Sequence, residues 1–217
     1  MATKRLSQAE KRAETRAALM HAARDVFGRR GYHGASLEEI AAEAGFSTGA
    51  LYYNFASKEV LFLALLDERI EGRIADIDAA FEQATTSTEG TAVQAQAATR
   101  GFMETLSESS QWRLLSFEFV AVAARDPALK RQVKKRFERM HVALTDLIDR
   151  RRSELGLQLP VASEELAATL AALGNGLAID AVLGLSLRDE VFGEMVGYLL
   201  AGIAGAAAAS EGKPTSD

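Results

Sequence analysis

Residues 36–61 carry the signals of two short helices joined by a glycine-containing turn, and a third helix starts directly after them. Ser36 is a potential N-cap for the first helix, and Glu39 three residues later completes the pattern of a capping box. This helix is expected to stop at Gly45, and Ser47 is the next potential N-cap. The pattern predicts a helix-turn-helix, a motif whose second helix lies in the major groove of DNA.

The orientation of the second short helix, from Thr48 to Phe55, follows from its period. At about 100° per residue, Leu51 and Phe55 share the core side, and Gly49 and Tyr53 lie nearly opposite. Glycine costs about 1 kcal/mol relative to alanine inside a helix, so Gly49 in the first turn indicates the close approach of another molecule. The alternative is that it tolerates tight helix packing. Two neighbouring tyrosines beside a capped helix N-terminus favour contact with DNA phosphates and the groove.

The helix that precedes this motif carries one apolar stripe that can cover the other two helices. Its members are Leu19, Ala22, Ala23, Val26 and Phe27. We expect this helix to end within residues 28–31. The first residues of the chain lack an apolar stripe, so we expect residues 1–11 to form a disordered tail, either a mobile basic arm or a solubilising extension.

The charge of the chain is divided unevenly along its length. Residues 1–35 hold eight basic and three acidic side chains, a net charge of +5, whereas the remainder holds 17 basic and 27 acidic side chains. The whole chain has a formal net charge of -5. A basic head on an acidic body is consistent with a nucleic-acid-binding module attached to a larger domain.

The string IAAEAGFSTGALYYNFASK, from Ile40 to Lys58, resembles the tetracycline-repressor-type (TetR) family of transcriptional regulators. The resemblance covers residues 15–66. It implies that Ser47, Thr48, Gly49 and Ala50 approach bases or adjacent phosphates. It also implies that the DNA backbone is held by Tyr52, Tyr53 and Lys58, and that Ser36 contacts a phosphate.

The period stays helical beyond Lys58 and strand signals are absent, so we predict an all-α fold of about nine helices. Later helices are expected near residues 57–85, 90–107, 111–125, 126–156, 164–185 and 188–209. Asp126 and Pro127 supply an N-cap and a first helical proline for one of them. We predict a helix-turn-helix domain over 12–72 with its motif at about 35–54, an effector-binding and dimerisation domain over 73–210, and a disordered tail over 211–217.

Aromatic and thioether side chains, with a few polar ones, form a possible ligand pocket in the second domain. The candidates are Met103, Trp112, Phe117, Phe137, His141 and Asn175. Taken singly, each aromatic residue is better explained by core packing. The resemblance adds that relatives bury a small-molecule effector among these middle helices.

The last two expected helices combine small residues with a broad apolar surface, which favours burial against a second copy of the chain. The candidate interface residues are Leu170, Gly174, Leu177, Phe192, Val196 and Leu199. The alternative is that these helices complete the core of one subunit. The resemblance favours a homodimer paired through these helices, which predicts a palindromic DNA operator as partner.

The remaining composition excludes several classes. The chain has no cysteine, its three histidines are not spaced for metal ligation, and no catalytic triad or phosphate-binding loop motif occurs. We therefore expect no enzyme, no cofactor and no metal. No apolar run of about 18 residues would span a bilayer, so we expect a cytoplasmic protein without membrane contact. A ligand-released repressor is the favoured function; an activator, a ligand-independent DNA-binding protein and a helical adaptor are the alternatives.

Overall fold

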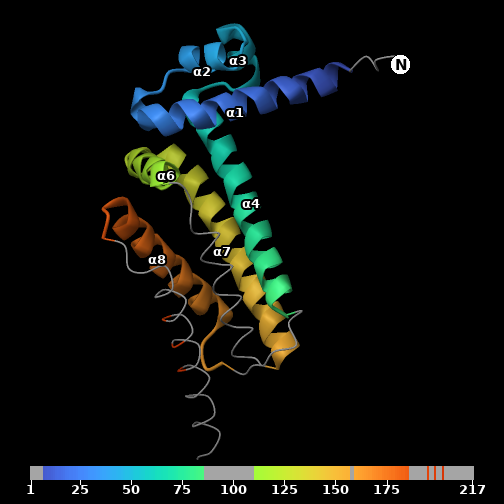
Figure 1. The fold of residues 1–217 in the computed structure, drawn as a ribbon, viewed down its shortest axis with the longest axis vertical. Coiled ribbons are helices and arrows are strands. Elements are labelled where there is room, and N and C mark those ends of the chain that lie inside the picture. Colours follow the sequence, from blue (N-terminus) through green and yellow to red (C-terminus); the bar gives the residue numbers. More distant parts are fainter. Residues whose placement is uncertain are drawn as a thin grey trace, which may run out of the picture. The chain divides into compact units, whose positions relative to one another are not determined.

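The computed structural model describes residues 7–85, 110–156 and 159–185, together with Met195, Tyr198 and Gly202. Every regular element in these residues is an α-helix (Figure 1). The helices are α1 (Gln8–Gly34), α2 (Leu37–Glu43), α3 (Thr48–Asn54), α4 (Lys58–Thr85), α6 (Ser110–Ala123), α7 (Pro127–Leu155) and α8 (Ser163–Val182). The all-α class is confirmed. The helix expected over 90–107 lies outside the described residues, as does nearly all of the one expected over 188–209.

The sequence signals place the ends of several helices correctly. Asp126 caps α7, because its Oδ1 accepts hydrogen bonds from the backbone N–H groups of Ala128 at 2.7 Å and Leu129 at 3.1 Å. Pro127 is the first helical residue, where its missing N–H costs nothing. Ser57 caps α4 through a 3.3 Å hydrogen bond from the N–H of Val60. No helix in the described residues is both long and apolar enough to cross a bilayer.

The start of α1 corrects the expectation of a disordered tail over residues 1–11. The helix begins at Gln8, because Ser7 forms a complete capping box with Glu10. The Ser7 hydroxyl accepts from the N–H of Glu10 at 3.2 Å, and the Glu10 carboxylate accepts from the N–H of Ser7 at 2.7 Å. Two N–H groups at the helix start are thereby satisfied. Residues 1–6 lie outside the described part.

The regular part of α1 ends within residues 28–31, as expected, because Gly31 has a non-helical backbone with φ +70° and ψ 173°. A short helical segment continues beyond this kink to Gly34. At the kink the N–H of Tyr32 donates to the Glu118 carboxylate of α6 at 2.7 Å. The kink moves the N–H of Tyr32 away from its hydrogen-bond acceptor within the helix, and the Glu118 carboxylate accepts this hydrogen bond instead.

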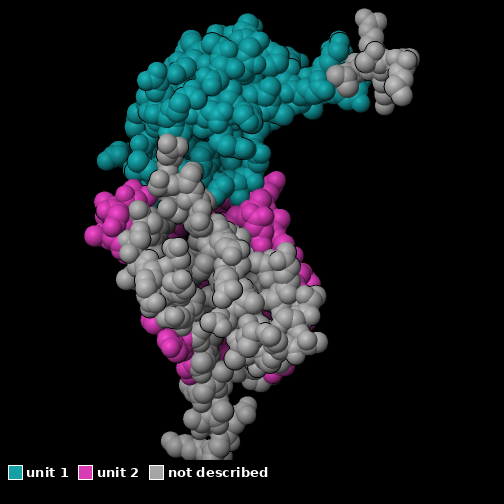
Figure 2. All heavy atoms as spheres, in the orientation of Figure 1, with its two compact units in different colours: residues 1–69, 111–134 teal, residues 70–110, 135–217 magenta. Residues whose placement is uncertain are grey.

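The chain divides into two compact units (Figure 2). Unit 1 comprises Met1–Arg69 and Gln111–Lys134, and unit 2 comprises Ile70–Ser110 and Lys135–Asp217. The boundary between the units falls within the continuous helix α4, between Arg69 and Ile70, whereas we predicted it between residues 72 and 73. However, α6 and the first two turns of α7, which we assigned to the second domain, belong to unit 1.

An aromatic cluster explains why α6 belongs to unit 1. Phe62 of α4 lies 4.1 Å from Phe119 and 5.9 Å from Trp112 of α6, measured between ring centroids. Tyr32 lies 5.0 Å from Phe119, and Phe27 lies 5.3 Å from Phe62. All five residues are buried, so α1, α4 and α6 share one core.

Unit 2 contains the second part of α4, most of α7, and α8. Arg151 of α7 is buried and donates to Glu82 of α4 at 2.7 Å and to Glu154 at 2.6 Å. Arg150 pairs with Asp78 of α4 at 3.0 Å. These contacts tie α4 to the C-terminal half of α7.

Candidate DNA-binding site

The first helix of the helix-turn-helix, α2, begins at the predicted cap. The Ser36 hydroxyl accepts from the N–H of Glu39 at 3.1 Å, but the reciprocal half of the predicted capping box does not form. The Glu39 carboxylate instead accepts from Nε of Arg30 at 3.2 Å. After α2 the chain turns at Gly45, whose φ of +74° lies in the left-handed region that favours glycine.

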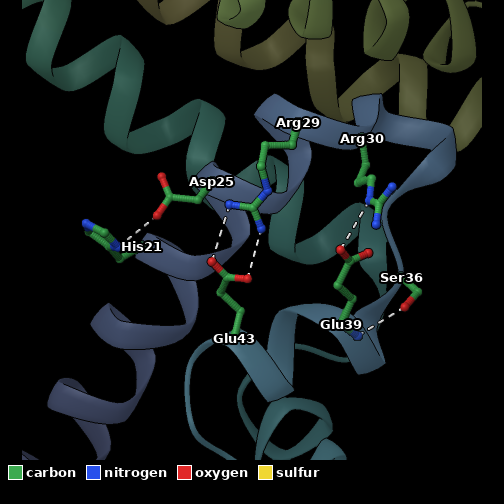
Figure 3. Close-up of polar contacts among 7 residues, drawn as sticks. All are labelled: His21, Asp25, Arg29, Arg30, Ser36, Glu39 and Glu43. Atoms are coloured by element: carbon green, nitrogen blue, oxygen red, sulfur yellow. Dashed lines mark hydrogen bonds and ion pairs between the residues drawn. The ribbon is translucent and has the colours of Figure 1, made fainter.

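Two ion pairs connect α1 to α2 (Figure 3). Arg29 donates to both carboxylate oxygens of Glu43, at 2.8 and 3.3 Å, and this hydrogen bonding raises the pKa of Arg29. Arg30 pairs with Glu39 as described above. Both pairs are partly exposed, and exposed ion pairs add little to the stability of a fold. Their main effect is therefore to fix the position of α2 along α1. Figure 3 also shows the pair between His21 and Asp25 within α1, at 3.4 Å.

The orientation predicted for α3 is confirmed. Leu51 and Phe55 are fully buried, whereas 49% of Tyr52 and 71% of Tyr53 remain exposed. The Ser47 hydroxyl caps the helix by accepting from the N–H of Ala50 at 3.2 Å. The N-terminus of α3 and its two tyrosines are therefore open to a partner on one side, while the other side is anchored in the core.

Gly49 lies at the exposed start of α3, and the fold does not require a glycine there. A Cβ at this position would have the Ser47 hydroxyl oxygen as its nearest neighbour, at 3.8 Å, which is an ordinary van der Waals separation. The backbone at Gly49 is also not in the left-handed region. Space is thus free in the isolated chain at the point where a base edge or phosphate would approach a recognition helix.

Arg16 of α1 holds the C-terminal end of α3, which the sequence analysis did not predict. Its guanidinium donates to the carbonyl of Asn54 at 3.3 Å and lies 4.2 Å from the ring centroid of Phe55. A cation at a helix C-terminus is favoured by the helix dipole. The spacing of Arg12 and Arg16, four residues apart, was the available signal, because it places both on one side of α1.

Lys58 is held within the protein by hydrogen bonds that the sequence did not indicate. Its Nζ donates to the carbonyls of Ala35 at 2.6 Å and His33 at 3.3 Å, and it lies 4.7 Å from the ring centroid of Tyr32. Burial lowers the pKa of Lys58. The amine therefore fixes the connection between α1 and α2, and a phosphate contact by Lys58 stays a prediction.

The residues predicted for a ligand pocket do not all belong to the same unit. Trp112 and Phe117 belong to unit 1, where Trp112 is buried and stacks on Phe62. Phe137 is half-buried and His141 is exposed in unit 2. Met103 lies outside the described residues.

An open pocket lies within unit 2, and the empty space inside it, counted together with the adjoining solvent, is about 600 Å³. Its lining comprises Arg73, Ile74 and Asp78 of α4, Met140, Ala143, Leu144, Leu147 and Arg150 of α7, and Leu170, Ala171, Gly174 and Asn175 of α8. Of the predicted pocket residues, Asn175 lines this cavity. The walls are mainly apolar, with charged or amide groups contributed by each helix.

The predicted dimer residues are only partly described. Leu170 and Gly174 line the cavity of their own subunit, together with Ala171. The side chain of Leu177, and Phe192, Val196 and Leu199, lie outside the described part. A dimer interface formed by these residues stays a prediction.

The folded α2–turn–α3 unit, with a capped and exposed second helix, defines a helix-turn-helix DNA-binding protein. Residues 19–65 match the family described as bacterial regulatory proteins of the tetR family, and residues 93–205 match the C-terminal region of BetI-type transcriptional repressors. The chain belongs to the TetR family of transcriptional regulators. It is a DNA-binding regulator, as the resemblance of Ile40–Lys58 implied.

Two curated relatives are similar over part of the chain. The HTH-type transcriptional activator FasR of Mycolicibacterium smegmatis is 36% identical over 139 residues, which are 64% of this chain and 61% of FasR. The HTH-type transcriptional regulator CymR of Pseudomonas putida is 26% identical over 152 residues, which are 68% of this chain and 70% of CymR. The match to FasR therefore spans less than two thirds of that protein.

Solved structures share the fold at low identity. Salmonella enterica GusR superposes with a TM-score of 0.68 at 21% identity, covering 92% of this chain and 98% of GusR. The transcriptional regulator FadR from Bacillus subtilis, solved in complex with stearoyl-CoA, has a TM-score of 0.66 at 14% identity, covering 87% of this chain and 98% of FadR. At these identities the likeness establishes the fold alone.

Proposed function

We propose that this protein is a homodimeric repressor that binds a palindromic operator and is released by a small apolar or amphipathic ligand. The observation that carries the DNA-binding part is the exposed face of α3, where Gly49, Tyr52 and Tyr53 are accessible while Leu51 and Phe55 anchor the helix. A dimer with one recognition helix per subunit reads two half-sites, about 34–36 Å or a multiple of that apart.

The direction of regulation has two candidates. The match of residues 93–205 to BetI-type repressors supports repression, whereas the 36% identity to the activator FasR supports activation. A reporter fused to the bound promoter distinguishes them. Deleting the regulator raises expression if it represses, and lowers expression if it activates.

The ligand-release mechanism rests on the cavity in unit 2 and on the continuity of α4. This helix runs from unit 1 into unit 2, and its residues Arg73, Ile74 and Asp78 line the cavity. A ligand that prefers one arrangement of α4 therefore shifts the spacing of the two α3 helices in a dimer. The apolar walls with a few charged groups suit an amphipathic ligand, the class to which the stearoyl-CoA of the FadR structure belongs.

A cavity-filling variant with a matched control tests the proposed pocket. Ala171 lines the cavity, and the neighbouring Ala172 is exposed on the same helix. In a panel of amphipathic ligands that includes stearoyl-CoA, we expect Ala171→Phe to abolish ligand-induced release and Ala172→Phe to preserve it, with DNA affinity unchanged in both. Release that persists in Ala171→Phe places the ligand elsewhere.

Linkage gives the second test of induction. A ligand that weakens operator binding by some factor must itself bind operator-bound protein more weakly than free protein by the same factor. Calorimetric titration of the ligand into both forms measures this ratio. Equal affinity for the two forms rules out induction by that ligand.

A further inference from the structure

The first two turns of α1, residues 8–14, make an exposed helix with no apolar face. All seven side chains are exposed, so burial against the core contributes nothing to keeping this segment helical. The capping box of Ser7 and Glu10 fixes its start, and hydrogen bonding to Ser7 lowers the pKa of Glu10. Residues 8–14 therefore form a helical extension that is fixed by its cap and does not pack into the core of unit 1.

Charge is sorted around this extension, and its basic side contacts α3. Glu10 and Glu14 lie on one side of the helix, whereas Arg12 and Arg16 lie on a side about 200° away, from the period of about 100° per residue. Arg12 has its Cζ 5.0 Å from the ring centroid of Tyr53. The position of Arg16 at the end of α3, described above, confirms that this side faces the recognition helix.

The two arginines have different surroundings. Arg16 donates a hydrogen bond to the backbone of α3, so it positions that helix. For Arg12, the contact that the structure shows within the described residues is the one with the face of the Tyr53 ring. A cation–π contact with the ring face does not use the N–H donors of a guanidinium as hydrogen-bond donors, so they stay available to a phosphate.

We infer that the first two turns of α1 are part of the DNA interface, and that Arg12, which lies over the Tyr53 ring, contacts a backbone phosphate flanking the half-site read by α3. This inference rests on DNA binding through α3. The segment offers no apolar surface of the kind that forms the centre of a protein interface. Arg12 places a positive charge next to the exposed Tyr53 of α3, and this charge is complementary to the negatively charged DNA backbone. The contact with the ring also restricts the arginine before DNA arrives, which reduces the entropy lost on binding.

The salt dependence of DNA binding tests this contact. The probe is the duplex that the wild-type protein recovers from a random-sequence pool, and its affinity is measured from about 50 to 200 mM salt. We expect Arg12→Ala to lower the slope of log affinity against log salt by about 0.9 per contact, or about 1.8 for a dimer. Lys130→Ala removes the same charge from the exposed first turn of α7 and should keep the wild-type slope.

Two substitutions of Tyr53 test the role of the ring. Tyr53→Phe keeps the aromatic face, so adding Arg12→Ala to it should still reduce the slope as in the wild-type background. Tyr53→Leu removes the face, so the loss of affinity caused by Arg12→Ala should become smaller there. Equal losses in both backgrounds overturn the ring-contact part of the inference.

The outcomes separate this inference from the proposed function. Wild-type protein that recovers no duplex defeats DNA binding, and the inference fails with it. Wild-type binding with an unchanged slope in Arg12→Ala defeats the inference alone. Circular dichroism and the elution volume of each variant check that the helices and the oligomeric state are retained.

Discussion

Replacing Gly31 with alanine should destabilise unit 1 strongly, because two separate costs meet at this residue. With φ +70° and ψ 173°, the backbone occupies a region that is essentially restricted to glycine, and forcing another residue into it costs about 1–3 kcal/mol. A Cβ would also lie 3.0 and 3.1 Å from the two carboxylate oxygens of Glu118. The carboxylate must then move and weaken its 2.7 Å hydrogen bond from the N–H of Tyr32, a further loss of about 1.5–3 kcal/mol. We expect a total of about 2.5–6 kcal/mol.

Urea unfolding followed by tryptophan fluorescence measures this effect directly. Trp112 is the one tryptophan of the chain, and it stacks on Phe62 within unit 1, so its signal reports the unit that contains Gly31. With an m value of about 2 kcal/mol per molar urea, the midpoint should fall by about 1.3–3 M.

Gly34→Ala is the matched control, and a double-mutant cycle separates the two costs. Gly34 has no positive φ, and a Cβ there would meet only Cβ of Arg30 at 3.6 Å, so its effect should stay within about 1 kcal/mol. In a Glu118→Ala background, Gly31→Ala should cost only the backbone part. A Gly31→Ala protein as stable as the wild type refutes this account of the kink.

Three further predictions concern residues of unit 1, the unit that contains the helix-turn-helix. Ser47→Ala removes the cap of α3, so it should lower the unfolding free energy by about 1 kcal/mol and weaken DNA binding. Urea unfolding and the anisotropy of a labelled duplex measure the two effects. Ser7→Ala, which uncaps the exposed end of α1, should destabilise the core less. Burial, and then Glu59, raise the pKa of Tyr32 above its ordinary 10.0, so the folded state keeps a proton that the unfolded state loses. Stability should therefore fall as the pH rises above about 10, and Tyr32→Phe should show a smaller fall across this range. Lys58→Ala should cost about 1 kcal/mol through the lost hydrogen bonds to two carbonyls, and an unchanged salt slope of DNA binding would contradict a phosphate contact by this lysine.

The local parts of the fold were predictable from the sequence, because their causes lie within a few residues. Ser47 and Asp126 cap helices through contacts two to three residues away. The burial of Leu51 and Phe55 follows from the helical period alone. The exposure of Tyr53 follows in the same way, so the face of α3 that we propose to contact DNA was predictable from the sequence alone.

The parts that the sequence did not reveal depend on residues far apart in the chain. The helix end at Gly31 was predicted, but the short helical segment after it was not, and its Tyr32 N–H bonds to the carboxylate of Glu118, 86 positions away. Trp112 suited a pocket or a core equally well by spacing, and only its stacking on Phe62 assigns it to unit 1. The pairing of Arg12 with Tyr53 likewise needs the two helices to be placed in space.

The central claim, that α3 binds DNA through its exposed N-terminal face, is tested most directly by measuring folding stability and DNA affinity together in Gly49→Ala. The free protein has room for the added methyl group, and alanine favours a helix, so the unfolding free energy should rise by up to about 1 kcal/mol. If DNA approaches Gly49 closely, the same methyl group should weaken binding to the selected duplex about tenfold or more, the effect of an overpacking cost above about 1.4 kcal/mol. Gly72→Ala, at a helical glycine that likewise has open space around its Cβ position, should raise stability and leave DNA affinity unchanged. Wild-type DNA affinity in a stabilised Gly49→Ala protein would contradict the claim.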